Sequence, residues 1–259
     1  MTIDLHNHTP LCNHATGSIE EFAQNAIEKK IDIFGFSDHA PMKFDEKYRM
    51  SFEQMPQYET EVLHAKEKYR SKIEILLGYE VDFIKGFIDD RVINANVDYL
   101  IGSVHFLNDW GFDNIDFIGE YQNRDIDKIW EDYFEAIKEM AKSNLFDIVG
   151  HIDLIKLFKY LPKKDIKIIA KNAIKAIKKS NMAVEINSAG LRKPIHEIYP
   201  SSDIMELLAD FDIPITFGSD AHKIEDISYK KDEIIKYAKS FGYKKCAIFR
   251  KKERELVNF

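Results

Sequence analysis

The residues best suited to chemistry are two histidines near the start of the chain, His6 and His8, within the stretch 3–10. We expect this stretch to be a short strand that runs into a loop. Side chains alternate faces along a strand, so His6 and His8 should point the same way. Two neighbouring imidazoles are costly in a core but form a natural pair of metal ligands. The pair therefore predicts a metal site, to which His14 in the following loop can contribute.

Further histidines and acidic residues follow apolar stretches that we predict to be strands. These strands are expected at about 31–36, 72–78, 99–102, 146–149 and 213–217. The polar residues at or just past their ends are His39, Glu80, His105, His151, Asp220 and His222. In parallel (β/α) barrels the chemistry lies at the carboxyl ends of the strands, so this placement indicates one shared site.

Helical segments separate these strands along the whole chain. They are predicted at about 18–30, 52–70, 126–143, 162–179, 202–210 and 225–240, with an irregular loop at 107–124 and further strands at 182–186 and 244–248. Ser18 and Glu21 suit a capping box, and Pro162 marks a helix start. No linker or low-complexity segment divides the chain. We therefore expect an α/β fold, a single distorted (β/α) barrel of seven or eight strands over residues 1–259.

Composition narrows the class of protein. The 259 residues are 45% hydrophobic, enough for a sizeable core. A net charge of −7 with dispersed lysines argues against nucleic-acid binding, although bound metal would let an anionic substrate approach. Two cysteines form no disulfide framework, and no membrane span or leader is recognisable. We expect a cytoplasmic protein with a small-molecule partner and no membrane partner. The sequence leaves open whether the chain forms a homo-oligomer.

The number of candidate ligands indicates more than one metal ion. Seven histidines and two acids are too many for one ion and suit two or three divalent ions. Imidazole suits Zn, Fe and Mn, and a carboxylate can bridge two ions. A pair of such ions can share a hydroxide and hold a phosphoryl oxygen during in-line displacement. The residues therefore predict metal-assisted hydrolysis of a phosphoester.

Six short motifs resemble those of the PHP (polymerase and histidinol phosphatase) family. They occur in order as D-L-H-N-H-T at 4–9, F-S-D-H-A at 36–40, G-Y-E-V-D at 78–82, G-S-V-H-F at 102–106, G-H-I-D at 150–153 and G-S-D-A-H at 218–222. The stretch 187–201 is similar to the substrate loop of the histidinol-phosphate phosphatase branch. The resemblance implies hydrolysis of L-histidinol phosphate to L-histidinol and phosphate, a step of histidine biosynthesis.

The resemblance also implies how the ligands are shared among three ions. The first ion would be held by His6, His8, Glu80 and Asp220. The second would be held by Glu80, His105 and His151, with Glu80 bridging. The third would be held by His14, His39 and His222. A hydroxide bridging the first two ions would attack phosphorus, and the third ion would orient the ester.

Substrate contacts are less completely specified. We expect Arg192 to bind the phosphate with its forked guanidinium. The resemblance places a second arginine near 153–156, where this chain has Lys156 and Lys159, so the second phosphate contact stays open. Further candidates are Ser103, His196, Glu197 and Tyr199; a surface position or packing explains the last three nearly as well. The leaving alcohol could be protonated by a metal-bound water, by Asp220 or by a histidine such as His222.

Several residues and functions have competing interpretations. Asp38 is expected to orient an imidazole rather than to bind metal, and for Asp82 two interpretations stay open, the same role or a position facing water. Cys12 suits a small loop residue better than a ligand. Alternative functions are a phosphoesterase for another phosphomonoester or a nucleotide, a non-catalytic PHP module, and a mononuclear amidohydrolase. The intact ligand set opposes the non-catalytic module, and nothing in the sequence requires the carboxylated lysine of an amidohydrolase.

Overall fold

A seven-stranded parallel sheet forms the centre of the computed structural model, which describes residues 1–259. Its strands follow the chain in the order β1, β2, β3, β4, β7, β8 and β9. They span Ile3–Asp4, Ile33–His39, Glu74–Asp82, Tyr99–Ser103, Ile148–Val149, Ala183–Asn187 and Ile215–Gly218. Their register aligns the functional ends, because His39 on β2 lies opposite Glu80 on β3.

The first and last strands of this sheet meet and bring it close to a closed barrel. Just beyond β1, the Leu5 amide donates to the carbonyl of Phe217 on β9 at 2.8 Å. The His8 amide donates to the Ala221 carbonyl at 2.9 Å. The predicted α/β barrel is therefore confirmed, with seven strands.

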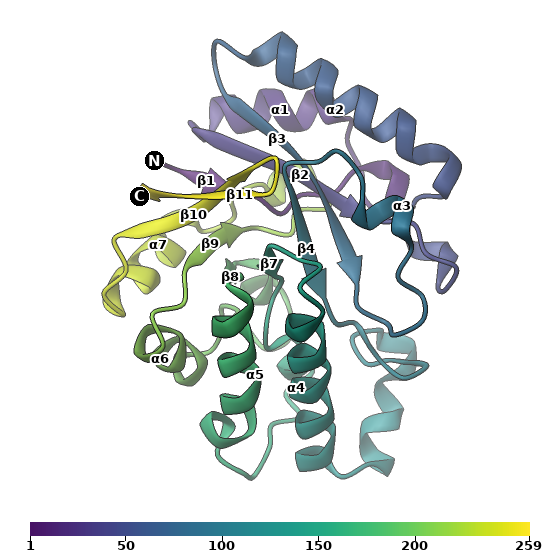
Figure 1. Ribbon diagram of the computed structural model, residues 1–259, viewed down its shortest axis with the longest axis vertical. Coiled ribbons are helices and arrows are strands. Elements are labelled where there is room, and N and C mark those ends of the chain that lie inside the picture. Colours follow the sequence, from purple (N-terminus) through teal and green to yellow (C-terminus); the bar gives the residue numbers. More distant parts are fainter.

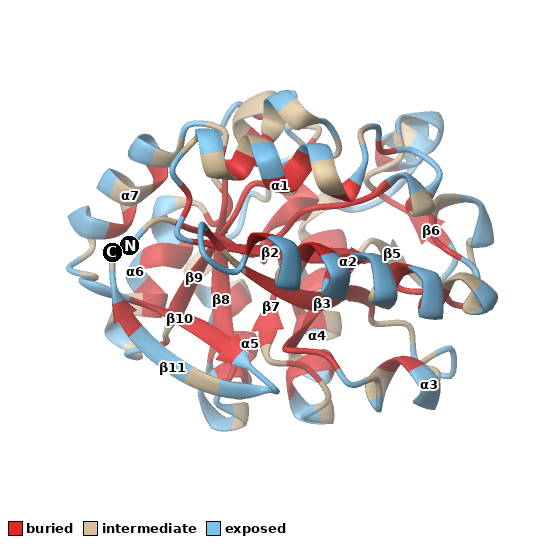
Figure 2. Ribbon diagram, turned by 90° about the horizontal axis from the view of Figure 1, so that it is seen from above, coloured by how far each residue is buried: buried red, intermediate tan, exposed pale blue.

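Helices surround the barrel (Figure 1). They are α1 Ile19–Glu28, α2 Met55–Tyr69, α3 Asp90–Ile93, α4 Ile126–Ser143, α5 Ile166–Ser180, α6 Ser202–Asp210 and α7 Lys231–Ser240. Figure 2 shows buried strands inside and exposed outer helix faces, the arrangement expected of amphipathic helices. The predicted capping box of Ser18 and Glu21 is present at the start of α1.

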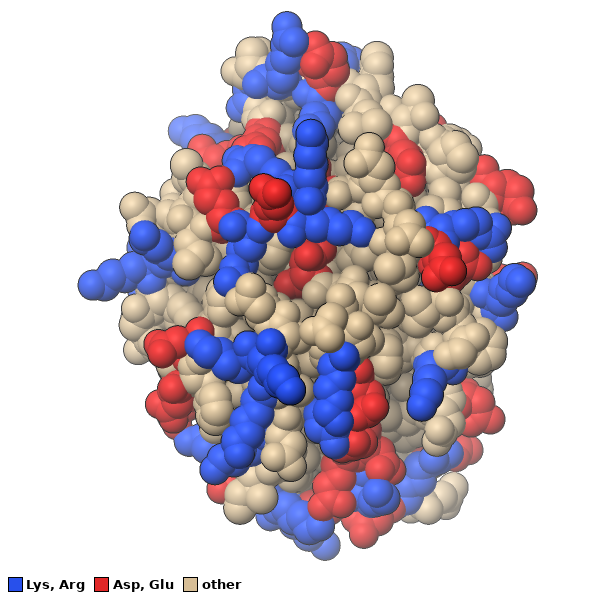
Figure 3. Space-filling model, viewed as in Figure 1, with Lys and Arg blue, Asp and Glu red and all other residues tan.

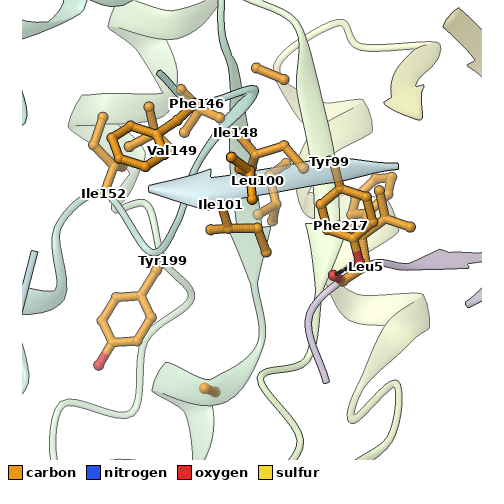
Figure 4. Close-up of a cluster of buried hydrophobic side chains, with 14 of the residues drawn as sticks. Leu5, Tyr99, Leu100, Ile101, Phe146, Ile148, Val149, Ile152, Tyr199 and Phe217 are labelled. Atoms are coloured by element: carbon orange, nitrogen blue, oxygen red, sulfur yellow. Dashed lines mark hydrogen bonds between the residues drawn. The ribbon is translucent and has the colours of Figure 1, made fainter. Parts of the chain in front are cut away.

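The barrel interior is filled around Tyr99 on β4, which belongs to a cluster of 73 buried hydrophobic residues. Its hydroxyl donates to the Leu5 carbonyl at 2.6 Å, across the barrel (Figure 4). A Cβ at Gly35 would lie 2.0 Å from the Tyr99 hydroxyl oxygen, and one at Gly78 would lie 2.6 Å from its ring. The two glycines are therefore needed for Tyr99 to cross the barrel and hold β1, the strand that leads into His6 and His8.

Two predicted helix starts were wrong. Helix α5 begins at Ile166 rather than at Pro162, because the side chain of Asp165 accepts from the Lys167 amide and caps it there. Helix α7 begins at Lys231 rather than near residue 225, and a separate 3₁₀ turn covers Ile224–Asp226.

The loop predicted at 107–124 is more ordered than expected. It contains the small hairpin of β5 (Phe106–Leu107) and β6 (Trp110–Gly111). A 3₁₀ segment then runs over Ile115–Asn123 before α4 begins.

The end of the chain forms a hairpin outside the barrel. Strand β10 (Lys245–Arg250) pairs in antiparallel fashion with β11 (Glu253–Asn258), which the sequence did not reveal. Met1 donates to the Asn258 carbonyl at 3.0 Å, so the two termini lie together (Figure 1). Basic and acidic side chains intermingle on the face shown in Figure 3. None of the helices combines the length and apolar character needed to cross a membrane.

Candidate active site

The carboxyl ends of the barrel strands surround a cavity of about 670 Å³. Seven of the predicted metal ligands line it: His14, His39, Glu80, His105, His151, Asp220 and His222. His6 and His8 lie beneath them and are fully buried. The structure thus brings all nine predicted ligands to one end of the barrel, although they come from segments far apart in the chain.

These residues form groups that can each hold a metal ion. In three of the groups the ligand atoms lie within 4.8 Å of one another: His6 with His8 and Glu80; Glu80 with His105 and His151; and His14 with His39 and His222. Asp220 joins the first group, because its Oδ1 lies 3.1 Å from His8 Nε2 and 3.9 Å from His6 Nε2. Glu80 is shared by two groups, as expected of a bridging carboxylate.

The donor atoms that face the centre of the cluster fit bound cations. The Nε2 atoms of His6, His8 and His222 are buried and make no well-aligned hydrogen bond within the chain. Buried polar atoms rarely stay without a partner. Imidazole nitrogens together with carboxylate oxygens are a suitable donor set for Zn, Fe or Mn. The cluster can therefore hold metal ions.

Electrostatics favours ionised carboxylates in this cluster. Burial by itself would raise the pKa of Glu80, but His6, His39 and His105 hold that pKa well below its ordinary value. Burial opposes ionisation of Asp220 in the same way, and its pKa is nevertheless lowered, by His6 and His8 in particular. Both carboxylates are therefore charged at neutral pH and ready to bind cations.

The histidines of the third group are held in the neutral form. Burial lowers the pKa of His39 to about 4, an effect that Glu80 only partly opposes. Burial, and then the neighbouring His8, lower the pKa of His222. Burial likewise lowers the pKa of His14. Because metal binding requires neutral imidazole, these three residues present the ligand form at neutral pH.

A second row of acidic residues orients the imidazoles. Asp38 Oδ1 lies 3.3 Å from His8 Nδ1, and Asp82 contacts His105 Nδ1. Each acid is thus placed to orient an imidazole, the role expected of Asp38 and one of the two left open for Asp82. Glu185 Oε1 lies 2.8 Å from His6 Nδ1. A partner on Nδ1 fixes the tautomer and directs Nε2 at the metal site.

Glu185 is the functional residue that the sequence analysis missed. It lies on β8 between buried apolar residues, and a lone charge in such a strand was the available signal. Its Oε2 accepts from the His151 amide at 2.9 Å, so it braces two histidines. A Cβ at Gly218 would lie 1.9 Å from Glu185 Oε1, so this glycine makes room for the carboxylate.

Arg192 lies at the cavity wall in a position to bind an anion. Its Nη2 donates to the carbonyls of Ser219 and Asp220 at 2.8 and 3.1 Å. Its Nη1 is buried and makes no hydrogen bond within the chain. The guanidinium is therefore anchored on one side and free to donate on the other.

The structure does not bring Lys156 to the cavity. The side chain is buried, and its Nζ lies 3.0 Å from Asp153 Oδ2 and 3.2 Å from Glu197 Oε2. It also donates to the Ile198 carbonyl at 2.8 Å. These contacts use the ammonium group, so the structure speaks against Lys156, the sequence candidate for the second phosphate contact that had stayed open.

Only one of the other predicted substrate contacts, Tyr199, lines the cavity. Ser103 lies behind the cluster and donates to Glu80 Oε1 at 2.7 Å. His196 is exposed and Glu197 is paired with Lys156, both outside the cavity lining.

Comparison with known proteins agrees with this geometry. The PHP domain model matches residues 4–189. A protein of Deinococcus radiodurans named "Probable histidinol-phosphatase" is 37% identical over 244 residues, which cover 92% of this chain and 93% of the relative. The "Histidinol-phosphatase" of Bacillus subtilis is 30% identical over 256 residues, which cover 87% of this chain and 95% of the relative.

A solved structure shares the fold. Histidinol phosphate phosphatase from Lactococcus lactis, complexed with Zn, L-histidinol and phosphate, superposes with a TM-score of 0.78 at 20% identity and covers 98% of both chains. The barrel, the clustered ligands and the family match over residues 4–189 lead to one assignment: this chain belongs to the PHP family.

Proposed function

We propose that the protein is a metal-dependent phosphomonoesterase that hydrolyses L-histidinol phosphate to L-histidinol and phosphate in histidine biosynthesis. The observation that carries this proposal is the cluster of nine ligand residues around one cavity, with the free Nη1 of Arg192 at its wall. Two relatives that align over most of this chain are named histidinol-phosphatases, one of them as probable. The Lactococcus lactis protein of the same fold holds Zn, L-histidinol and phosphate.

The proposed cofactors are two to three divalent ions, Zn, Fe or Mn. The first would be held by His6, His8, Glu80 and Asp220; the second by Glu80, His105 and His151; the third by His14, His39 and His222. When bound, such ions make hydroxide available near neutral pH and neutralise phosphoryl oxygens.

The chain's own residues position the substrate and the ligands. Arg192 would donate to the phosphate, and its anchored side places the guanidinium before the substrate arrives. Glu185, Asp38 and Asp82 hold the imidazoles in one orientation.

A substrate panel tests this assignment. The protein would be assayed on L-histidinol phosphate, p-nitrophenyl phosphate and nucleoside monophosphates. We expect kcat/KM for L-histidinol phosphate to exceed the others by at least about tenfold, the discrimination that one charged contact supplies. Equal values would refute this substrate and favour a general phosphomonoesterase.

Metal analysis separates the enzyme from a non-catalytic module. We expect at least two ions per chain after purification without chelator. Fewer than two ions together with no turnover on any ester would refute the catalytic assignment.

We propose that the reaction takes place in the cytoplasm, because Cys12 and Cys246 are both unpaired, as is usual in a reducing compartment.

A further inference from the structure

One carboxylate in the cavity has no partner in the chain. The cavity is lined by six acidic residues: Asp45, Glu80, Asp82, Asp113, Asp220 and Asp226. Five of them are paired. Asp45 and Asp82 contact Arg49, Asp226 contacts Arg192, and Glu80 and Asp220 belong to the ligand cluster. Asp113 forms no ion pair, and no other residue donates a hydrogen bond to its side chain.

Asp113 lines the same cavity as the histidine cluster and several apolar side chains. It is half-buried; burial raises the pKa of its carboxyl, and His105 of the second ligand group opposes that rise. It belongs to the segment between β6 and the 3₁₀ segment Ile115–Asn123. From the 3₁₀ segment, Ile115 and Phe117 also line the cavity, although they are 63% and 48% exposed.

The exposed apolar side chains mark a place where a ligand can bind. Large apolar side chains grouped on an open surface commonly indicate a binding surface. Phe158, which follows a different strand, also lines the cavity. An aromatic or heterocyclic ring placed against these side chains would be removed from water.

The proposed substrate carries the groups that such a surface needs. In L-histidinol phosphate the ammonium group is on the carbon next to the ester methylene, and the imidazole is attached further along. With the phosphate at Arg192 and the ligand cluster, the ammonium would come close to the cluster and the imidazole would extend outward. Asp113 lines the same cavity as the cluster, and Ile115 and Phe117 follow it closely in the chain and line that cavity too.

We propose that Asp113 determines specificity by binding the ammonium group of the substrate, while Ile115 and Phe117 contact its imidazole. This inference rests on the function proposed above and adds the residue that recognises the leaving group. A half-buried carboxylate without a cation is poorly solvated, which costs free energy. Binding of an ammonium group beside it offsets this desolvation cost. A phosphate ester without an amino group gains nothing from Asp113, so this residue selects for the substrate.

The test compares two substrates on two variants. The substrates are L-histidinol phosphate and its deamino analogue, 3-(imidazol-4-yl)propyl phosphate. Asp113→Asn removes the charge at the same size, and Asp109→Asn removes a charge from an exposed position of the same loop. We expect Asp113→Asn to lower kcat/KM for L-histidinol phosphate by about 10- to 100-fold, mainly through KM, and to leave the analogue within about twofold. Asp109→Asn should behave as wild type.

The outcomes distinguish this inference from the proposed function. Suppose that wild type prefers L-histidinol phosphate over p-nitrophenyl phosphate, and that Asp113→Asn still prefers L-histidinol phosphate over the deamino analogue as strongly as wild type does. The role of Asp113 is then refuted and the proposed function stands. An equal loss on both substrates also refutes it, since Asp113 would then act on the phosphate or the metals. If wild type shows no preference over p-nitrophenyl phosphate, the function itself fails. The variants are first checked for the metal content and thermal unfolding of wild type; if Asp113→Asn disturbs either, Asp113→Ser replaces it under the same criteria.

Discussion

Glu80 is the residue on which the candidate metal centre converges. Its carboxylate oxygens lie within 3.7 Å of nitrogens of five imidazoles: His6, His8, His39, His105 and His151. The side chain is only 1% exposed, so its charge depends on these partners and on cations bound among them. A neutral side chain of the same shape should therefore separate the effect of charge from that of packing.

Glu80→Gln should lose metal and turnover together. An amide is a weak ligand and cannot bridge two cations as a carboxylate does. We expect at least one ion fewer per chain, measured by elemental analysis, and a kcat reduced by at least about 100-fold, measured by phosphate release. Glu67→Gln, at a 71% exposed position, is the matched control. Full metal content with normal turnover would remove Glu80 from the bridging position.

Arg192→Ala should weaken substrate binding more than chemistry. The substitution removes the unpaired Nη1 of a residue that lines the cavity. We expect KM for the phosphate ester to rise by about 10- to 100-fold, the value of one charged hydrogen bond. Arg192→Lys keeps the charge but loses the fork, and should recover only part of the affinity. The control is Arg70→Ala, at a 73% exposed position, and an unchanged KM would exclude Arg192 from the phosphate site.

Asp147 predicts a pH dependence of stability away from the metal centre. Burial raises its pKa from 3.8 to about 6. Between these values the folded chain binds more protons than the unfolded chain, so stability falls as the pH rises from about 4 to about 6. Above that range the ionised carboxyl destabilises the fold at full strength.

Asp147→Asn should therefore stabilise the protein only at the higher pH. The amide oxygen can still accept from the Leu100 amide, now 2.9 Å from the carboxylate. We expect the free energy of unfolding to exceed that of wild type by about 1–3 kcal/mol at about pH 7.5, and to equal it near pH 4. Urea titrations at both pH values measure this. An equal difference at both would show that ionisation of Asp147 is not the cause.

At the scale of elements, two loops at the strand ends are joined through Lys156. The loop after β7 carries Asp153 and Lys156, and the loop after β8 carries Glu197. Lys156 contacts Glu197 and the Ile198 carbonyl, while Asp153 Oδ2 accepts from the Ser201 amide at 2.7 Å. The lysine therefore holds one wall of the cavity together from outside the cavity.

Lys156→Met should destabilise the fold more than it alters substrate binding. It leaves Asp153, which is fully buried, without its cation. Removing one partner of a buried pair costs about 3–5 kcal/mol. The double variant Asp153→Asn, Lys156→Met should recover part of the loss. Urea unfolding measures both, with exposed Lys163→Met as control; a rise in KM without loss of stability would instead favour direct contact with substrate.

At the scale of the whole molecule, ions held by the proposed ligands would join segments from both ends of the barrel sheet. His6 and His8 follow β1, and Asp220 and His222 follow β9, the two strands that meet where the barrel closes. Ions that bind only the folded chain stabilise it by mass action, by about 4 kcal/mol when their concentration is a thousand times Kd.

Removal of metal by chelation should therefore lower both activity and thermal stability. We expect turnover to be lost and Tm to fall, with both restored when Zn or Mn is added back. Mg should restore neither fully, because it prefers an all-oxygen ligand set. Differential scanning calorimetry and phosphate release provide the two measurements. A Tm unaffected by chelation would contradict ions that bridge the two ends of the sheet.

The sequence by itself determined the features that depend on local order. The sequence predicted α4 over Ile126–Ser143 and α6 over Ser202–Asp210 with the boundaries that the structure has. The ends of the predicted strands located eight of the nine candidate ligands, because a parallel barrel places all carboxyl ends on one face, and the loop after the first strand supplied His14. The role of Asp38 followed from its position beside His39, whereas that of Asp82 stayed open.

Only the tertiary structure decided which side chains meet across the barrel. Glu185 reaches His6 because Gly218 leaves room for it, Lys156 turns away from the cavity toward Asp153, and Asp113 stays unpaired. The β10–β11 hairpin was missed for a related reason. Strand β10 pairs in antiparallel fashion with β11, and this pairing cannot be inferred from β10 alone. Burial and pairing are properties of the space around a side chain, and residues distant in sequence fill that space.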